Sequence, residues 1–342
     1  MRSATPMVIT GVLVVVGLVA CVLSVMVAIT LGAADISLVN VRDIVGNHLG
    51  VTDIPVRRSE DAIVWQDRLP RSLVAAAAGA GLAICGVVLQ SLLRNPLADP
   101  FLLGISSGAS TGAVVLGILG LGAGAVGLSG GAFIGALVAF ALVVFLARVS
   151  GGTTDRLVLA GIAVTQLFSA LTSLVIFAFA DADETRGVMF WLLGSLDGVR
   201  WGDVQVAAAA AVLGVAVCWA LAHVLDAFAF GDDVASSLGV PVTAVRSALL
   251  VVTALVTAAL VSVTGAIGFV GLVLPHAARF LVGPGHARLI PVCSVVGAVF
   301  MVWVDTVSRV AFSPTPLPVG VATALIGVPA FVALMSRRGA RP

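Results

Sequence analysis

The sequence predicts an all-α integral membrane protein, and its composition is the first reason. Of its 342 residues, 60% are hydrophobic and 10% are charged, and the mean hydropathy is +1.18. A soluble domain carries about 25% charged residues, so these charges are too few to cover the surface of a water-soluble globule. The second reason is that the apolar residues fall into runs of about 20, the length of a helix that crosses a bilayer.

Ten candidate spans can be placed along a single transmembrane domain, residues 1–342. They are residues 7–31, 69–93, 98–120, 124–147, 157–180, 204–225, 245–263, 267–282, 289–307 and 319–335. The first run resembles a signal peptide, but its length favours a retained span. The seventh and eighth spans are separated only by a glycine hinge near Gly265, and ten helices are favoured over nine.

An even number of spans places both termini on one side of the membrane. When that side is the cytoplasm, ten arginines lie inside and eight outside, in agreement with the positive-inside rule. This orientation makes residues 32–66 an outer-face loop. It also leaves Arg68, Arg71 and Arg309 at span ends on the outer side, where the rule disfavours them, so a function for positive charge is expected there.

Several functions are excluded or disfavoured by what the sequence lacks. All 18 basic residues are arginine, and without lysine the chain cannot form a Walker A site. The net charge of +1 argues against nucleic acid as a partner. No HExxH or GxSxG motif is present, and no cluster of cysteines and histidines has metal-ligand spacing. Asp305 is expected to pair with Arg309 four residues later, and such scarce intramembrane acids disfavour a proton-coupled carrier.

A first polar segment, residues 94–100 (RNPLADP), interrupts the apolar pattern on the inner side. Pro96 and Pro100 bracket it and make the backbone turn sharply. A tight turn between two spans and a segment that contacts a partner both fit this pattern.

A second polar segment, residues 230–241 (FGDDVASSLGVP), also lies on the inner side. Gly231 before two aspartates suits the start of a helix, Gly239 suits its end, and Pro241 prevents continuation. The pattern predicts a helix of about two turns between two spans. A plain linker needs no caps at both ends, so docking of a partner protein is favoured over simple connection.

A third segment, residues 265–276 (GAIGFVGLVLPH), is rich in glycine and contains a proline. This composition predicts a bent or broken helix. His276 has no neighbouring ligand residues, and a hydrogen-bonded structural histidine is favoured over a metal site.

These segments resemble FecCD-type permeases, the membrane subunits of binding-protein-dependent ABC importers for iron-siderophores, haem and vitamin B12. The similar segments are RLPRSLVAAAAGAGLAICGVVLQSLLRNPLADPFLLGISSGA (68–109), FWLLGSLDGVRW (190–201), GDDVASSLGV (231–240), GAIGFVGLVLPHAARFLVGPGHARLIP (265–291) and LPVGVATALIGVPAF (317–331). They extend from the second span to the last. The resemblance therefore covers most of the chain.

The resemblance implies a type II ABC importer permease architecture with ten spans. It implies a second permease subunit, two ATPase subunits on the cytoplasmic face and a solute-binding protein on the outer face. The location implied is a bacterial cell membrane, with both termini cytoplasmic. No catalytic residue, metal or cofactor is expected in this chain, because ATP is hydrolysed by the partner subunits.

The resemblance also assigns residues to two contact sites. Residues 226–245 become a cytoplasmic coupling loop that meets the ATPase. The expected ATPase-coupling residues are Gly231, Asp232, Asp233, Val234, Ala235, Leu238 and Gly239, together with Arg94, Asn95 and Pro96. Arg68, Arg71 and Arg309 match outer arginines that meet acidic residues of the binding protein, since guanidinium pairs well with carboxylate. Pro316 replaces the acidic residue that the family usually has before LPVG, which leaves the charge pattern near Arg309 open.

The function expected is import of an iron-siderophore by alternating access, with haem and cobalamin as the next choices. The order rests on the frequency of substrates in the family, because its motifs persist while its substrates differ. An ion-coupled secondary transporter that works without an ATPase is the alternative, and a membrane-embedded enzyme is disfavoured by the missing catalytic groups. Whether the permease pair is a homodimer or a heterodimer is left open.

Overall fold

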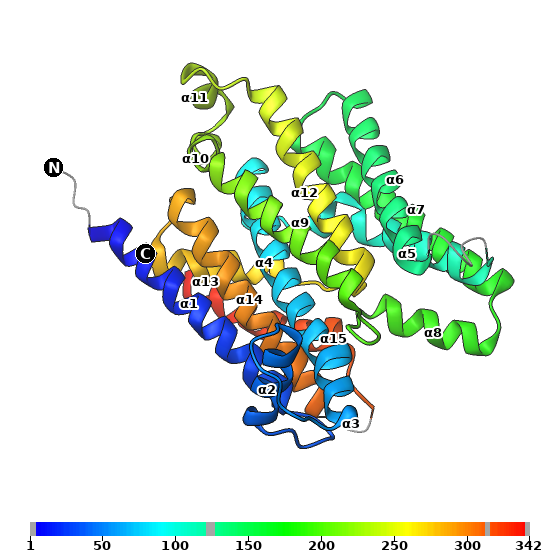
Figure 1. The fold of residues 1–342 in the computed structure, drawn as a ribbon. Helices are drawn as coiled ribbons and strands as arrows, with labels where there is room; N and C mark the ends of the chain where they lie inside the picture. Colours follow the sequence, from blue (N-terminus) through cyan, green and yellow to red (C-terminus); the bar gives the residue numbers. More distant parts are fainter. Residues whose placement is uncertain (1–4, 121–126, 312–314, 339–342) are drawn as a thin grey trace.

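The computed structural model describes residues 5–120, 127–311 and 315–338, and every regular element within them is helical (Figure 1). The predicted start of the fourth span at residue 124 and both chain ends lie outside the described residues. In chain order the elements are α1 (Thr5–Thr30), α2 (Leu38–His48), α3 (Arg58–Asp61), the π-helical η1 (Ala62–Arg68), α4 (Leu69–Leu92), the 3-10 turn η2 (Pro100–Leu103), α5 (Ile105–Ile118), α6 (Gly127–Val149), α7 (Thr154–Phe179), α8 (Ala182–Leu192), α9 (Trp201–Ala220), α10 (Ala222–Ala229), α11 (Asp232–Ser237), α12 (Val242–Thr264), α13 (Val270–Val282), α14 (His286–Val310) and α15 (Val319–Arg338).

Within the described residues, seven helices are long and apolar enough to cross a membrane. Three shorter apolar helices, Ile105–Ile118, Val270–Val282 and Val319–Ala333, coincide with the remaining predicted spans. The prediction of an all-α membrane protein with about ten transmembrane helices is confirmed.

Two predicted spans have different ends in the structure. The span expected at 98–120 begins only at Ile105, because the Asp99 side chain caps the 3-10 turn η2 and delays the start of α5. The span expected at 204–225 ends at Ala220, where the helix breaks and α10 begins.

The long helix from Arg58 to Leu92, which contains α4, forms the centre of the bundle. Of its apolar window 78% is buried, against 17% for α7. A Cβ on Gly86 would overlap the carbonyl oxygen of Gly271 in α13, and one on Gly79 would overlap that of Gly297 in α14. Small residues therefore let the backbones of α4, α13 and α14 approach closely, as is typical of helix packing in membranes.

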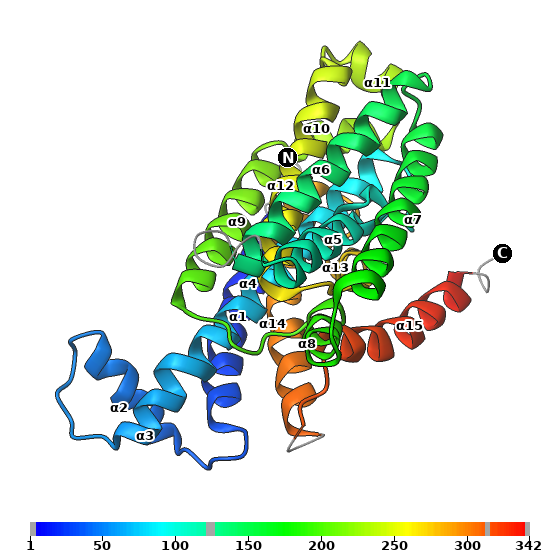
Figure 2. The same ribbon diagram turned by 90° about the vertical axis from the view of Figure 1, so that its right-hand side faces the viewer.

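α5, α6 and α7 form a second group of packed helices beside this centre (Figure 2). A Cβ on Gly112 of α5 would overlap the carbonyl oxygen of Gly131 in α6. The Thr111 hydroxyl lies 2.8 Å from both the Phe168 carbonyl oxygen and the Thr172 hydroxyl of α7. Because little of α7 is buried, most of its surface is free to face lipid or a second protein chain.

Residues 32–66 fold into α2, α3 and most of η1, which project sideways from the bundle (Figure 2). The His48 ring stacks on Trp65 with centroids 4.0 Å apart, and its Nε2 lies 2.8 Å from Asp61. Trp65 in turn contacts Trp201 at the start of α9. We call this end of the molecule the α2 end, and the opposite one, which carries α10 and α11 (Figure 1), the α11 end.

The chain between α12 and α13 leaves the helical conformation, as the glycine-rich segment predicts. α12 ends at Thr264 and α13 begins at Val270. The end of α12 is hydrogen-bonded to the turn after α8, since the Ser195 N–H donates to the Thr264 carbonyl at 3.0 Å. In α13, His276 Nδ1 lies 3.0 Å from the Leu272 carbonyl oxygen, as expected for a hydrogen-bonded structural histidine.

Candidate functional site

The first candidate site is α11 at the α11 end of the bundle. Gly231 and Gly239 bracket the helix with φ values of +109° and +82°, which residues other than glycine rarely adopt. No side chain caps its start, so the helix depends on these two glycines and its own backbone hydrogen bonds. The predicted short helix is present, although Asp232 and Asp233 occupy its first turn rather than its cap.

α11 and its flanks expose three apolar side chains, alongside the polar side chains of Asp233, Ser236 and Ser237. Phe230 is 77% exposed and Leu238 is 68% exposed, and Val234 between them is also exposed. Ala235 is fully buried beneath them. Apolar side chains that gather on an exposed surface are typical of a protein interaction site.

The turn after α4 lies beside α11. The Asn95 carboxamide oxygen accepts a hydrogen bond from the Leu97 N–H at 2.9 Å, which makes residues 94–97 a tight turn. The Arg94 guanidinium lies 3.4 Å from the position that a Cβ on Gly231 would take. Pro96 is exposed beside it. The structure therefore brings together the two groups of residues that the sequence assigned to ATPase coupling.

The second candidate site consists of the arginines at the α2 end, of which Arg68 and Arg71 are both buried. The Arg71 Nε lies 2.9 and 3.0 Å from the two carboxylate oxygens of Asp305 on α14. Its Nη1 forms an ion pair with Asp197, in the loop between α8 and α9. The Asp305 side chain is 1% exposed, whereas that of Asp197 is 48% exposed. Arg71 thus already has two acidic partners within its own chain.

Arg68 and Arg309 instead hydrogen-bond to the end of α1. Arg68 is buried and donates to the carbonyls of Ile29 at 2.8 Å and Ala34 at 3.0 Å. Arg309 is half-buried and donates through Nη2 to the Ala28 carbonyl at 2.8 Å. Both arginines therefore fasten α4 and α14 to α1.

The prediction that Asp305 pairs with Arg309 is wrong. Within the described residues, the ion pair of Asp305 is with Arg71. The physical reason is that α14 packs against α4, so the guanidinium of Arg71 fills the site beside the buried carboxylate. Arg309 points instead to α1, where carbonyl oxygens at the helix end accept its hydrogen bond.

The second site is close to electrically neutral. Arg68, Arg71 and Arg309 are accompanied by four carboxylates, those of Asp35, Asp67, Asp197 and Asp305. An acidic partner would therefore meet compensated arginines rather than a bare positive surface. Pro316, which replaces the expected acid, lies in the segment before α15.

Sequence reasoning missed two residues that these sites use. Asp197 escaped because it contacts Arg71 across 126 positions of the chain, so no local spacing indicated it. Arg246 escaped for a similar reason, since its contact with Asp232 spans 14 positions and bridges two different helices. Asp197 lies within residues 190–201, one of the segments that carry the family resemblance, and Arg246 lies at the start of a predicted span, but neither position indicated the partner of its charge.

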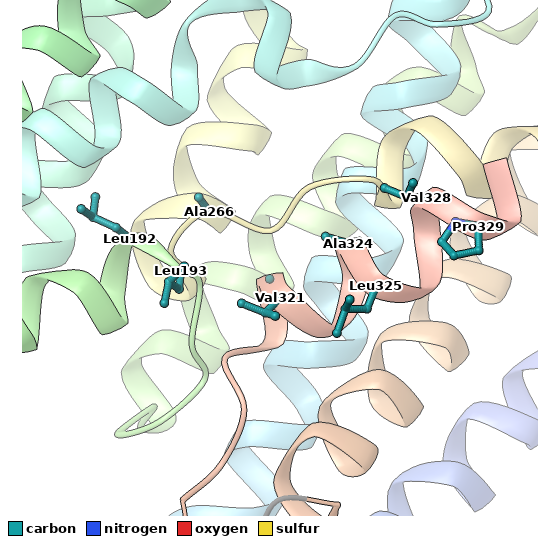
Figure 3. Close-up of a pocket in the computed structure, with 9 residues that line it drawn as sticks. Leu192, Leu193, Ala266, Val321, Ala324, Leu325, Val328 and Pro329 are labelled. Carbon is teal, nitrogen blue, oxygen red and sulfur yellow. The ribbon is translucent and has the colours of Figure 1, made fainter. Parts of the chain in front are cut away.

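A cavity of about 600 Å³ opens between the end of α8, the 265–269 segment and α15. Figure 3 shows the apolar side chains that surround it. They belong to Leu192, Leu193, Ala266, Val321, Ala324, Leu325, Val328 and Pro329. The cavity thus lies where the break between α12 and α13 meets the last span.

A helical bundle with about ten spans, a short exposed helix at one end and an apolar cavity is typical of a membrane transport protein. The FecCD transport family matches residues 9–337 of this chain, and the chain belongs to that family. It is an ABC importer permease.

The comparisons with individual proteins agree with this assignment. The chain is 44% identical to the cobalamin import system permease protein BtuC of Halobacterium salinarum, over 84% of this chain and 76% of that protein. It is 36% identical to the iron(3+)-hydroxamate import system permease protein FhuB of Bacillus subtilis, over 91% of this chain and 80% of that protein. A solved structure described as an inward-facing metal-chelate type ABC transporter has a TM-score of 0.82 at 29% identity, and covers 95% of this chain and 98% of that chain. The predicted family and type II architecture are confirmed.

Proposed function

We propose that this permease imports a metal chelate, either an iron-siderophore or a corrinoid, by alternating access driven by separate ATPase subunits. The observation that carries the proposal is α11, a short helix bracketed by glycines that exposes apolar side chains outside the spans. The chain contains no lysine and hence no P-loop of its own. An apolar docking helix supplies the place where a separate ATPase would bind.

The ATPase contact would consist of α11 with its flanks and the turn at residues 94–96. Leu238, Val234 and Phe230 offer apolar contacts, while Arg94 and Asp232 offer charges at the rim. An apolar centre with a polar rim is the usual anatomy of a protein interface. Two ATPase subunits, one for each permease subunit, would dock in this way on the cytoplasmic face. Both chain termini would lie on that same side of the membrane.

A solute-binding protein would dock at the opposite end, at Arg68, Arg71 and Arg309. Its acidic residues would compete with the internal carboxylates, and Asp197 is the accessible one among those bound to Arg71. Docking by this route would exchange one carboxylate for another at the same guanidinium. Charge reversal of Arg68 and Arg71 would weaken docking in a salt-dependent way.

A second permease subunit would complete the path along the face that carries α7. On this span Gln166, Ser169 and Ser173 are exposed and lie on one side of the helix. Polar side chains are costly against lipid and usually face a water-filled space. We therefore place the path between the α7 faces of two subunits, in a bilayer that surrounds the remaining apolar surface.

The names of two relatives support a metal chelate as the cargo, and an experiment must identify which chelate it is. One relative is named for cobalamin and another for an iron(3+)-hydroxamate, and the chain matches both over most of its length. An iron-siderophore and a corrinoid are both bulky metal chelates. Uptake of radiolabelled ferric hydroxamate and of cobalamin by a strain that lacks this permease, with and without the gene restored, separates the two.

Reconstitution into proteoliposomes tests the mechanism. The permease with its ATPase and binding protein should import chelate only when ATP is present, and the permease alone should import none. Import by the permease alone down an ion gradient would instead identify a secondary transporter and overturn the proposal. Ser169→Trp should block import while ATPase binding persists, which tests the placement of the path.

A further inference from the structure

Few polar contacts join α11 to the spans within the described residues. Glycine and short loops flank it on both sides, at residues 230–231 and 238–241. Within the part of the chain that the structure describes, its ion pair with a span joins Asp232 to Arg246 of α12. The distance from Arg246 Nη2 to the Asp232 carboxylate is 2.5 Å.

The same guanidinium also contacts α10. The Arg246 Cζ atom lies 5.5 Å from the centre of the Phe228 ring, the geometry of a cation–π contact. Phe228 is buried, so its ring is a fixed surface rather than a mobile side chain. Arg246 therefore sits between two helices and contacts both.

α10 is anchored to the bundle independently of Arg246. The Ser91 hydroxyl of α4 donates to the Leu225 carbonyl at 3.0 Å. At the start of α14, the His286 N–H and ring Nδ1 lie 2.9 and 2.6 Å from one Asp226 carboxylate oxygen. α10 is thus fixed to two spans, whereas α11 depends on Arg246.

Arg246 has bonding capacity that this conformation leaves unused. Its Nε is buried and has no hydrogen-bond partner, and its contact with Asp232 uses Nη2. A carboxylate can accept two parallel hydrogen bonds from a guanidinium. A small tilt of α11 that brings the second Asp232 oxygen to Nε would satisfy the buried donor. The pair therefore has a second hydrogen bond available to it when α11 tilts toward Nε.

α12 leads from this pair to the apolar cavity. It is a span packed against α4, α6 and α9, and it ends at Thr264, two residues before Ala266 in the cavity wall. A displacement of α12 at Arg246 would therefore reach the cavity through one continuous helix.

We propose that Arg246 is the positioning residue that transmits movement of α11 to α12, and thereby to the cavity, when a docked ATPase moves α11. The inference rests on the proposed function, because it assumes an ATPase at α11. It adds the side chain through which the movement passes. Docking itself uses the exposed apolar surface, so loss of Arg246 should leave ATPase binding in place.

The test measures ATP hydrolysed per chelate imported by the complete complex in proteoliposomes, alongside ATPase affinity in a pull-down. Arg246→Gln should raise the ratio of ATP to chelate about fivefold or more, the scale of a typical coupling between sites. ATPase affinity should stay within about twofold of wild type, a range below the cost of losing an interface anchor. Asp232→Asn should raise the ratio by less, because the contact of Arg246 with Phe228 remains.

A charge swap and a matched control complete the test. Arg246→Asp combined with Asp232→Arg should bring the ratio back toward wild type, which a general loss of packing could not do. Arg148→Gln removes an exposed arginine from the end of α6 and should leave the ratio unchanged.

An unchanged ratio in Arg246→Gln would overturn the inference. Loss of ATPase binding in that variant would overturn it as well, since Arg246 would then serve docking. If Arg246→Gln does not fold, the ratio of ATP to chelate is measured in Asp232→Asn instead. The Asp232 side chain is 40% exposed, so this variant is expected to fold. A wild-type complex that imports nothing would refute the proposed function instead, so the two failures are distinguishable.

Discussion

The two ends of the bundle present their side chains in opposite ways. At the α11 end, Phe230 and Leu238 are exposed apolar residues on a short helix outside the spans. At the α2 end, Arg71 is buried between the carboxylates of Asp305 and Asp197. A partner proposed for the α11 end would meet these side chains as they stand. The α2 end must first release an internal contact.

This difference has a physical cause. Covering exposed apolar surface with a partner lowers the free energy of the system, and no existing hydrogen bond or ion pair has to break first. Removing the carboxylate partner of a buried arginine without replacing it lowers the free energy of unfolding by about 3 to 5 kcal/mol. A partner at the α2 end must therefore offer a carboxylate of its own, whereas a partner at the α11 end needs only a complementary apolar groove.

The largest effect is expected from Asp305→Asn. This change leaves Arg71 with Asp197 as its acidic partner in a site where Asp305 is 1% exposed. The free energy of unfolding should fall by about 3 kcal/mol, the cost of breaking a buried ion pair. Denaturant unfolding in detergent micelles measures it.

Asp197→Asn is the matched control for that measurement. Its side chain is 48% exposed, so water compensates for the loss. The free energy of unfolding should fall by less than about 1 kcal/mol. Equal losses in both variants would contradict the distinction between a structural carboxylate and a displaceable one.

The next effect concerns the α11 end. Leu238→Asp places a charge in the centre of the apolar surface and should weaken ATPase affinity by about 2 kcal/mol, roughly thirtyfold. Thermal stability should not change, because Leu238 is 68% exposed. Val39→Asp alters a comparably exposed apolar residue on α2 and should leave ATPase affinity as in wild type. Similar ATPase binding by both variants would remove the docking role of α11.

A third, smaller effect separates the two roles at the α2 end. Asp197→Asn removes the accessible competitor for Arg71 and should strengthen binding of the solute-binding protein about tenfold at low salt. Arg309→Gln removes a positive charge and should weaken it. Titration of the binding protein at two ionic strengths measures both. Weaker binding by Asp197→Asn would show that the carboxylate belongs to the docking surface rather than blocking it.

The sequence predicted the fold well because spanning a membrane is a local property. A run of apolar residues identifies a span whatever its neighbours are, and the predicted runs coincide with the apolar helices of the structure. Errors arose where short polar contacts reset a helix end, as at Asp99, or where a helix broke inside an apolar run, after Ala220. α11 was predictable for the same local reason, since Gly231 and Gly239 lie beside it in the chain.

The partners of the charged residues could not be predicted in this way. Asp305 and Arg309 have the spacing of a helical pair, yet Asp305 bonds to Arg71, which lies 234 positions away. The choice depends on how α4 packs against α14, and apolar patterns do not encode it. Arg246 and Asp197 stayed hidden for this reason. The sequence drew attention to charged residues at the span ends, but it did not indicate which of them already have a partner within the chain.

The smallest expected effect compares the buried carboxylate of Asp305 with the partly buried carboxylate of Asp99. Asp305 is held by an arginine, whereas Asp99, in the loop after α4, accepts a hydrogen bond from the Phe101 N–H at 2.9 Å. Burial raises the pKa of Asp99 to about 6, and the Phe101 hydrogen bond offsets only part of that effect. A neutral amide at this position should therefore be favoured at neutral pH.

The sign of the pH dependence follows from this raised pKa. Between the ordinary pKa of Asp, about 3.9, and the raised value of about 6, the folded state binds more protons than the unfolded state. The contribution of Asp99 to stability is therefore largest at low pH and is lost as the pH rises through 6. Asp99→Asn keeps the capping oxygen, so it should raise the free energy of unfolding at pH 7.5 by about 1 kcal/mol. Unfolding measured at pH 5 and at pH 7.5 checks this, because the gain should fall to about half at pH 5, midway between the two pKa values. A gain of equal size at both values would contradict the raised pKa of Asp99, because such a gain would not depend on ionisation of this carboxylate.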